Sequence, residues 1–467
     1  MPFHDRADEL EALTSRWARG SAEFFVLWGR RRVGKTELLT QVLDGRRGIH
    51  FEATEALEHD HLEDFTRLLV QADPGNRLLA EQLLGSWDAA LAAIEQFVGD
   101  ERTLIVLDEF QWIAKAQPEI GSLLNRWWRL RGKNLPIFLV ISGSEVSFFE
   151  RHVLTGAMFG RRTGQQKLRP FRYRDAALFL PDYSPADRIR AFAVCGGMPY
   201  YLEQFDPARS LADNILEKIL YRDGVLHEEA ELLIHEELPD PARYSSILRA
   251  IQNGATRFNE IVMRTRLEPD FVNDALRRLR SLDLVERVVP VTAANPERSK
   301  QTYYTIADGY LRFHFRFVQP YASHLTTNAG AENHLRQTVL PNLDHFVSAP
   351  AFEEICRDFL GREENASTGR WWGHIREGAR SVVREVDAAA KNTSNTIVAI
   401  GSCKWRNDVM PYSEHELLVR LAPHIPGLGD QPRLYFFARE GFDDRLQALA
   451  ATSNGRIRLV APGDLFD

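Results

Sequence analysis

The chain has 467 residues, of which 44% are hydrophobic and 26% are charged, and its formal net charge is −7. This composition is ordinary for a globular protein of about three domains, and it excludes a polycation that binds nucleic acid through bulk charge. Three widely spaced cysteines, an N-terminus without a signal-peptide pattern and the lack of an 18-residue apolar run predict a cytoplasmic protein without a membrane span.

A glycine-rich loop near the N-terminus organises the chain. An apolar run over 24–28 precedes it, a helical pattern over 37–43 follows it, and the loop matches G-x-x-x-x-G-K-[ST]. Such a loop turns backbone N–H groups toward phosphate oxygens, and the helix N-terminus adds partial positive charge. We expect Lys35 to reach the β and γ phosphates and Thr36 to bind Mg²⁺. The residues expected to contact the nucleotide here are Gly29, Arg30, Arg31, Arg32, Val33, Gly34, Lys35, Thr36 and Glu37.

An apolar run over 103–107 ends in the pair Asp108-Glu109. A buried parallel strand that delivers carboxylates to its C-terminal edge has this pattern. Asp108 is the expected Mg²⁺ ligand, and Glu109 is the expected group that polarises the attacking water. The alternative is a strand that ends in a solvated acidic turn, and the distance of about 70 residues from the glycine loop favours the first interpretation.

A further apolar strand over 136–141 ends in small polar residues. Ser142 and Ser144 are candidates for a contact with the γ-phosphate or its water, although a simple strand-to-loop turn explains the same residues. Farther on, Arg161 and Arg162 lie in a glycine-bounded loop. They are candidates for an arginine finger that acts on a neighbouring subunit's nucleotide, and a pair of surface arginines is the alternative.

Five motifs then occur in a fixed order: GRRRVGKTELL, LIVLDEF, VISGSE, FGRRTG and CGGMPYYL. Together they resemble the archaeal-type ATPase family of prokaryotes, which are AAA/STAND-like P-loop NTPases, over about the first 230 residues. The resemblance implies ATP as the nucleotide, Mg²⁺ as its cofactor and a helical lid, positioned by the Gly-Gly-x-Pro turn at 196–199.

The region after residue 240 has a different character. Three helices, at 244–253, 257–264 and 269–282, precede two strands around a Pro/Asn/Ser loop, the order of a winged helix-turn-helix. Residues 241–320 contain 13 Lys/Arg and 8 Asp/Glu, an excess of five positive charges. The basic side chains expected on the recognition helix and the wing are Arg277, Arg278, Arg280, Arg298 and Lys300. They could neutralise DNA phosphates, and a protein-interaction or lid module is the alternative.

In the last part of the chain, a strand bearing Asp387 is followed by a turn and a second strand that ends at Lys404. This pattern resembles the core of PD-(D/E)XK nucleases, a domain that relatives of this ATPase family commonly carry. The resemblance implies that Glu353 and Asp387 bind Mg²⁺ and that Lys404 orients the water. The sequence departs from the pattern at Ser402, which stands where an acid is expected, and a neutral hydroxyl is a weak Mg²⁺ ligand. Either the domain only binds DNA or protein, or an acid from elsewhere, such as Glu385, replaces the missing carboxylate.

We therefore predict a multidomain α/β protein: a parallel-sheet P-loop ATPase core (1–165), a helical lid (166–238), a winged helix-turn-helix (239–325) and a restriction-endonuclease-like α/β domain (340–467). The expected function is an ATP-hydrolysing switch that acts on or near DNA, with a protein partner and homo-oligomerisation as open expectations. The alternative is a nucleotide-gated regulator that recruits proteins, with little turnover and no nuclease activity.

Overall fold

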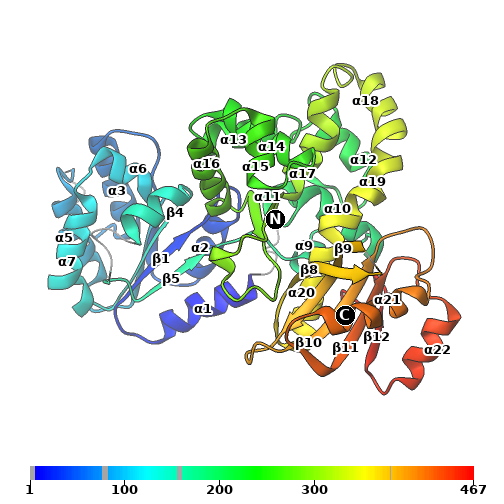
Figure 1. Ribbon diagram of the computed structural model, residues 1–467. Coiled ribbons are helices and arrows are strands. Elements are labelled where there is room, and N and C mark those ends of the chain that lie inside the picture. Colours follow the sequence, from blue (N-terminus) through cyan, green and yellow to red (C-terminus); the bar gives the residue numbers. More distant parts are fainter. Residues whose placement is uncertain (1–5, 76–82, 155–159, 379) are drawn as a thin grey trace. The chain divides into compact units, whose positions relative to one another are not determined.

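The computed structural model in Figure 1 describes residues 6–75, 83–154, 160–378 and 380–467. The chain forms two compact units. The first contains Met1–Pro170 and Met198–Tyr200, and the second contains Phe171–Gly197 and Tyr201–Asp467. In these described ranges, no helix is both long and apolar enough to cross a membrane.

The first unit is built on a five-stranded parallel sheet with the order β2-β3-β4-β1-β5. Its strands are β1 (Glu23–Trp28), β2 (Gly48–Glu52), β3 (Thr103–Asp108), β4 (Ile137–Gly143) and β5 (Gly164–Lys167). Its helices are α1 (Ala7–Ala18), α2 (Lys35–Leu43), α3 (Glu58–Ala72), α5 (Trp87–Val98), α6 (Phe110–Ala116), α7 (Ile120–Leu130) and α8 (Val146–Phe148). Every residue of β1, β3 and β4 is buried, as expected for strands covered on both faces. This is the parallel sheet of a P-loop NTPase.

The sheet brings the ends of three strands to one edge. Trp28, the last residue of β1, pairs with Gly143, the last residue of β4, and β3 ends between β4 and β2 at Asp108. Because ligands of open α/β sheets bind outside the carboxyl ends of the strands, this edge is the place for a site.

The second unit begins with helices and a small hairpin (Figure 1, green). The first helices are α9 (Tyr173–Ala177), α10 (Pro185–Cys195), α11 (Pro199–Gln204), α12 (Leu211–Asn214) and α13 (Glu229–Glu237), and the first two residues of α11 belong to the first unit. Next come α14 (Pro241–Gln252), α15 (Phe258–Thr265) and α16 (Pro269–Ser281), followed by the antiparallel strands β6 (Val285–Val288) and β7 (Tyr303–Ile306). These are the three helices and two strands expected from the sequence. Helices α17 (Gly309–Phe313), α18 (Asn328–His334) and α19 (Leu340–Val347) then lead to the C-terminal region.

The C-terminal region has a mixed five-stranded sheet with the order β12-β11-β10-β9-β8. Strand β9 is antiparallel to both of its neighbours, β8 and β10, and β10, β11 and β12 are parallel. The elements are α20 (Glu353–Glu364), β8 (Ser367–Glu377), β9 (Arg380–Lys391), β10 (Ile397–Lys404), α21 (Ser413–Leu421), β11 (Leu428–Ala438), α22 (Asp444–Thr452) and β12 (Ile457–Val460). A core that includes Ile400, Leu418 and Phe436 joins the sheet to its helices.

Candidate functional site

The glycine-rich loop joins β1 directly to α2. Gly34 has φ +88°, a conformation that L side chains rarely adopt. A Cβ at Gly29 would lie 2.3 Å from the carbonyl oxygen of Leu168. Both glycines are therefore required by the backbone, and the loop ends at the N-terminus of α2, where main-chain N–H groups favour anions.

Lys35 is buried at the first position of α2. Its Nζ donates hydrogen bonds to the carbonyl oxygens of Gly29 and Arg30, both at 3.1 Å. The same atom lies 4.0 Å from Glu109 Oε1. The ammonium group is thus held inside the loop by two neutral acceptors, and its charge acts on Glu109 and Asp108.

Asp108 lies at the end of β3 and is completely buried. Thr36 Oγ1 donates to Asp108 Oδ2 at 2.9 Å, and His50 Nε2 lies 3.3 Å from the same oxygen. Burial raises the pKa of Asp108, but the hydrogen bond and charge of His50, the charge of Lys35 and the hydroxyl of Ser142 outweigh it and lower the pKa to about 2. The result is an ionised carboxylate beside a hydroxyl, a pair of oxygen donors that suits Mg²⁺.

Glu109 caps the N-terminus of α6 with a left-handed backbone (φ +49°). Its Oε2 accepts hydrogen bonds from Ser144 Oγ at 2.6 Å, from the Ser144 N–H at 3.4 Å and from Gln111 Nε2. Gln111 Nε2 also donates to Ser144 Oγ at 3.3 Å. The carboxylate is therefore oriented by side chains from two neighbouring elements while its other oxygen faces Lys35.

The remaining residues predicted to contact the nucleotide surround this centre. Arg30 and Val33 are buried, Thr36 and Glu37 are exposed on the first turn of α2, and Ser142 is buried on β4. Arg32 stacks its guanidinium group on the ring of Tyr200, 4.5 Å from the centroid.

The two arginines predicted to act on a neighbouring subunit contact residues of their own unit. Arg161 Nε donates to Asn125 Oδ1 at 3.3 Å, and Arg162 Nη1 donates to the Leu154 carbonyl oxygen at 3.4 Å. Arg161 is exposed. Phe159, the first residue of that motif, lies outside the described residues. The arginine-finger role stays a prediction.

In the C-terminal region, the structure brings three of the four predicted residues together. Lys404 Nζ lies 3.2 Å from Asp387 Oδ2, which also accepts a hydrogen bond from the Cys403 N–H at 2.8 Å. Ser402 Oγ donates at 3.0 Å to Glu414 Oε2, and Lys404 Nζ lies 3.6 Å from the same oxygen. Burial lowers the pKa of Lys404, but the charges of the two carboxylates outweigh it and raise the pKa.

Glu353, the fourth predicted residue, is engaged differently. It forms ion pairs with Arg370 and with Arg357, the latter at 3.6 Å. Burial raises the pKa of Glu353 in spite of these arginines. Its carboxylate is already matched by two positive charges.

Three residues of these sites were not predicted from the sequence. Gln111 could have been found from the sequence, because it follows the acidic pair by only two positions and lies on the first turn of α6. His50 required knowledge of the sheet order, because it reaches Asp108 from the neighbouring strand β2. Glu414 comes from α21, beyond the strand motif that contains Ser402 and Lys404.

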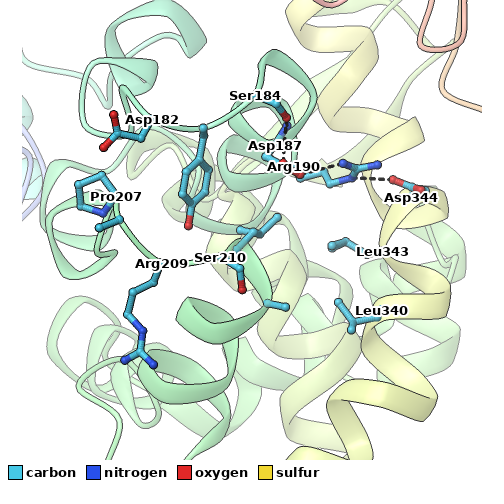
Figure 2. Close-up of a pocket in the computed structure, with 14 residues that line it drawn as sticks. Asp182, Ser184, Asp187, Arg190, Pro207, Arg209, Ser210, Leu340, Leu343 and Asp344 are labelled. Atoms are coloured by element: carbon cyan, nitrogen blue, oxygen red, sulfur yellow. Dashed lines mark hydrogen bonds and ion pairs between the residues drawn. The ribbon is translucent and has the colours of Figure 1, made fainter.

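A cavity of about 750 Å³ lies elsewhere in the second unit. Figure 2 shows Arg190 in its wall, linked to Asp187 at 2.8 Å and to Asp344 at 2.9 Å. Arg209, also in the wall, forms an ion pair with Glu217. The two arginines of this cavity are therefore already engaged by carboxylates of the same unit.

Comparisons with known proteins relate two stretches of the chain to described families. Residues 3–205 match a family described as an ATPase domain predominantly from Archaea, and residues 314–417 match a family of archaeal and bacterial proteins of unknown function. An uncharacterised protein of Methanocaldococcus jannaschii is 28% identical over 416 residues, which cover 87% of this chain and 88% of that protein. An uncharacterised ATP-binding protein of the same organism is 42% identical over 45 residues, which cover 10% of this chain and 76% of that protein.

Among solved structures, the Walker-type ATPase of Pyrococcus abyssi covers 67% of this chain and 96% of its own length, with 20% identity and a TM-score of 0.48. This likeness is too low to carry an inference about function.

Proposed function

We propose that the chain is an archaeal-type P-loop ATPase that binds ATP with Mg²⁺ and hydrolyses it in the cytoplasm, because residues 3–205 match the model of an ATPase domain predominantly from Archaea. One observation carries the proposal. Lys35 faces Glu109 at 4.0 Å while Thr36 donates to Asp108 at 2.9 Å, so a phosphate-binding lysine, two oxygen donors for Mg²⁺ and a carboxylate for water meet at one sheet edge.

Different residues bind the phosphates, hold Mg²⁺ and accept the proton of the attacking water. The main-chain N–H groups at the start of α2 bind phosphate oxygens, and Lys35 exchanges its two carbonyl acceptors for the β and γ phosphates. Thr36 and Asp108 would hold Mg²⁺, which when bound offsets the negative charge of the phosphates. Glu109 accepts a proton from a water whose oxygen bonds to the γ-phosphorus as the bond from that phosphorus to the bridging oxygen of ADP breaks.

The second unit supports a role on DNA. Arg277 is 70% exposed on α16, and Arg298 and Lys300 are exposed in the loop between β6 and β7. Such groups can neutralise phosphates. Arg278, by contrast, donates to the Glu237 carbonyl oxygen at 2.8 Å. We assign α14–α16 with β6 and β7 as a winged helix that contacts DNA through the exposed basic residues.

The hairpin also contacts the C-terminal sheet. Arg370 Nη1 of β8 donates to the Tyr303 hydroxyl of β7 at 2.7 Å, and the rings of Tyr303 and Trp372 lie 5.2 Å apart. A nuclease-like role of that sheet on the same nucleic acid is therefore part of the proposal. In a homo-oligomer, Arg161 would act as the finger for a neighbouring nucleotide.

A regulator with little turnover is the second candidate. The three hydrogen bonds that Glu109 Oε2 accepts from Ser144 and Gln111 favour it, because they occupy the oxygen that would otherwise contact the attacking water. In this form the protein holds ATP until a partner changes the position of Glu109.

The test is phosphate release from ATP by the full-length protein, with and without duplex DNA. We expect Glu109→Gln to keep ATP binding and to lower turnover at least about a hundredfold, whereas Glu119→Gln, at an exposed glutamate of the same unit, leaves it unchanged. Turnover that DNA does not alter removes the coupling to DNA. Unchanged turnover in Glu109→Gln overturns the assignment of the base.

A further inference from the structure

The second unit contains a recess of about 300 Å³ whose walls are the hairpin β6–β7 and the strands β8 and β9. Hydrogen bonds join the two walls. The Val291 N–H donates to the Arg370 carbonyl oxygen at 2.8 Å, and Arg370 Nη1 donates to the Tyr303 hydroxyl at 2.7 Å. Four cationic side chains line this hairpin recess, namely Arg287, Arg357, Arg370 and Lys391.

Carboxylates compensate only part of the positive charge in the hairpin recess. Arg357 and Arg370 both pair with one carboxylate, that of Glu353, and the two arginine side chains are only 16% and 17% exposed. Among the described residues that line the recess, Glu286 alone is acidic. Four cations therefore stand against two carboxylates, which leaves an excess of two positive charges.

Two further carboxylates act on Arg370 from outside the recess. The charges of Glu385 and Asp387 both raise the pKa of Arg370, but neither side chain lines the recess. Glu385 is exposed to solvent, and Asp387 lies 3.2 Å from the ammonium group of Lys404, which compensates it. The positive excess in the recess therefore persists when these groups are considered.

The excess charge lies on Arg287 and Lys391. Three main-chain carbonyls of the loop between β6 and β7 accept hydrogen bonds from the guanidinium group of Arg287, those of Pro296, Glu297 and Ser299. These neutral acceptors orient the group and leave its charge unmatched. The ammonium group of Lys391 has no hydrogen-bond or ion-pair partner among the described residues. Both cations are therefore available to an anion.

The other groups in the recess indicate which anion it suits. The hydroxyls of Thr305 and Thr368 line it, and neither has a hydrogen-bond partner in the part of the chain that the structure describes. Hydroxyl, ammonium and guanidinium groups all donate to phosphate oxygens, and guanidinium groups do so most strongly. Apolar side chains that could cover a small carbon skeleton also line the recess: Val288, Val289, Pro290 and Pro350.

We propose that the hairpin recess binds the phosphate group of a small phosphorylated molecule. Such a group carries about two negative charges at pH 7, which matches the positive excess. Arg287 and Lys391 supply the main contacts, because Glu353 already engages Arg357 and Arg370. A small molecule fits better than duplex DNA, since these last two arginines are each less than one-fifth exposed. The bound phosphate would touch both walls and hold the hairpin against the C-terminal sheet.

The first experiment titrates the full-length protein with inorganic phosphate by calorimetry. We expect Lys391→Gln and Arg287→Gln each to weaken one phosphate site at least about tenfold, because a charged hydrogen bond is lost. Arg249→Gln, at an exposed arginine of α14, is the matched control. Phosphate that binds the glycine loop of the first unit contributes equally to every titration.

Phosphate binding by Lys391→Gln that equals binding by Arg249→Gln overturns the proposal. Arg287 also orients the loop of the hairpin, so Arg287→Gln can disturb that loop as well as the recess. Lys391→Gln removes no contact with a described residue and therefore isolates the loss of charge. Thermal unfolding of each variant verifies that it is folded.

The second experiment measures the binding of duplex DNA by fluorescence anisotropy, with and without terminal phosphates on the duplex. We expect Arg298→Gln to weaken DNA binding and Lys391→Gln to leave it unchanged. Equal weakening by both variants, or weakening by Lys391→Gln only when the duplex ends are phosphorylated, assigns the recess to DNA and overturns the proposal. If phosphate binding depends on Lys391 but the protein binds no DNA, the recess stands and the proposed role on DNA fails.

Discussion

Each unit of the molecule holds a lysine beside carboxylates, but the two lysines have different partners. Lys35 donates to two main-chain carbonyls of the glycine loop and lies 4.0 Å from one carboxylate. Lys404 lies between the carboxylates of Asp387 and Glu414. The first ammonium group gives up neutral acceptors when an anion arrives, whereas the second leaves a pair of negative charges behind if it moves.

This difference indicates how each lysine can act. A phosphate can attract Lys35 away from two neutral acceptors, while Thr36 and His50 continue to contact the buried Asp108. Lys404 compensates two carboxylates at once, so its departure would leave two partly buried charges unmatched. The predictions below test this contrast, beginning with the largest expected effect.

Removing Lys35 should abolish turnover. We expect Lys35→Ala to lower the rate of ATP hydrolysis about a thousandfold, because the charge that stabilises the transferring phosphoryl group is lost. Phosphate release measures this rate, with Lys133→Ala, at an exposed lysine of the same unit, as the control. Lys404→Ala should leave ATP turnover unchanged. Turnover retained in Lys35→Ala would contradict the mechanism.

Acid should destabilise the second unit, because it contains a buried histidine that stays neutral in the folded chain. His314 is 2% exposed, and burial lowers its pKa to about 4, with a small contribution from the charge of His227. Between pH 6.5 and 4 the unfolded chain binds a proton that the folded chain does not bind. The stability contributed by neutral His314 is therefore present above pH 6.5 and is lost as the pH falls to 4, by about 3 kcal/mol.

His314→Gln removes this titration. The difference in unfolding free energy between pH 7 and pH 4, measured with urea, should shrink by about 3 kcal/mol in the variant. His374→Gln, at an exposed histidine of the same unit, should keep the full pH dependence. The same dependence in all three proteins would show that His314 titrates normally.

Removing Lys404 should destabilise the nucleotide-free protein more than removing Lys35. We expect Lys404→Ala to lower the unfolding free energy by about 2 kcal/mol, because two partly buried carboxylates lose their counter-charge. Thermal unfolding measures the loss, and equal destabilisation in Lys35→Ala and Lys404→Ala would remove the contrast between the two sites.

The smallest effect concerns the orientation of Glu109. Ser144→Ala removes the 2.6 Å hydrogen bond to the carboxylate and should lower kcat about tenfold without changing the affinity for ATP. Ser122→Ala, at an exposed serine of α7, is the matched control. Steady-state kinetics separate kcat from KM. A higher kcat in Ser144→Ala would instead favour the regulator, in which Ser144 restrains the base.

Predictions from the sequence were most accurate where the residues of a site lie within one short stretch of the chain. The glycine loop, Lys35 and Thr36 are adjacent, so the strand and helix on either side fix their geometry. The strand that ends at Asp108 is confirmed as well. Long uninterrupted apolar runs leave little choice between a buried strand and a loop.

The sequence predicted least where a site is assembled from separate elements. Glu414 reaches Ser402 only because α21 packs beside β10, and no spacing rule indicates that contact. His50 meets Asp108 because β2 neighbours β3, an order that the strand patterns do not contain. The place of Met198–Tyr200 in the first unit likewise depends on packing that leaves no mark in composition or periodicity.

That three-residue segment also limits how the protein can be divided. The chain passes between the units after Pro170, after Gly197 and after Tyr200. A fragment that stops at residue 170 would lose the ring on which Arg32 stacks, together with Pro199, whose Cγ is 3.8 Å from where a Cβ on Gly34 would be. No single cut in the gene therefore isolates an intact nucleotide-binding unit. A continuous fragment that retains Tyr200 must also include residues 171–197, which belong to the second unit.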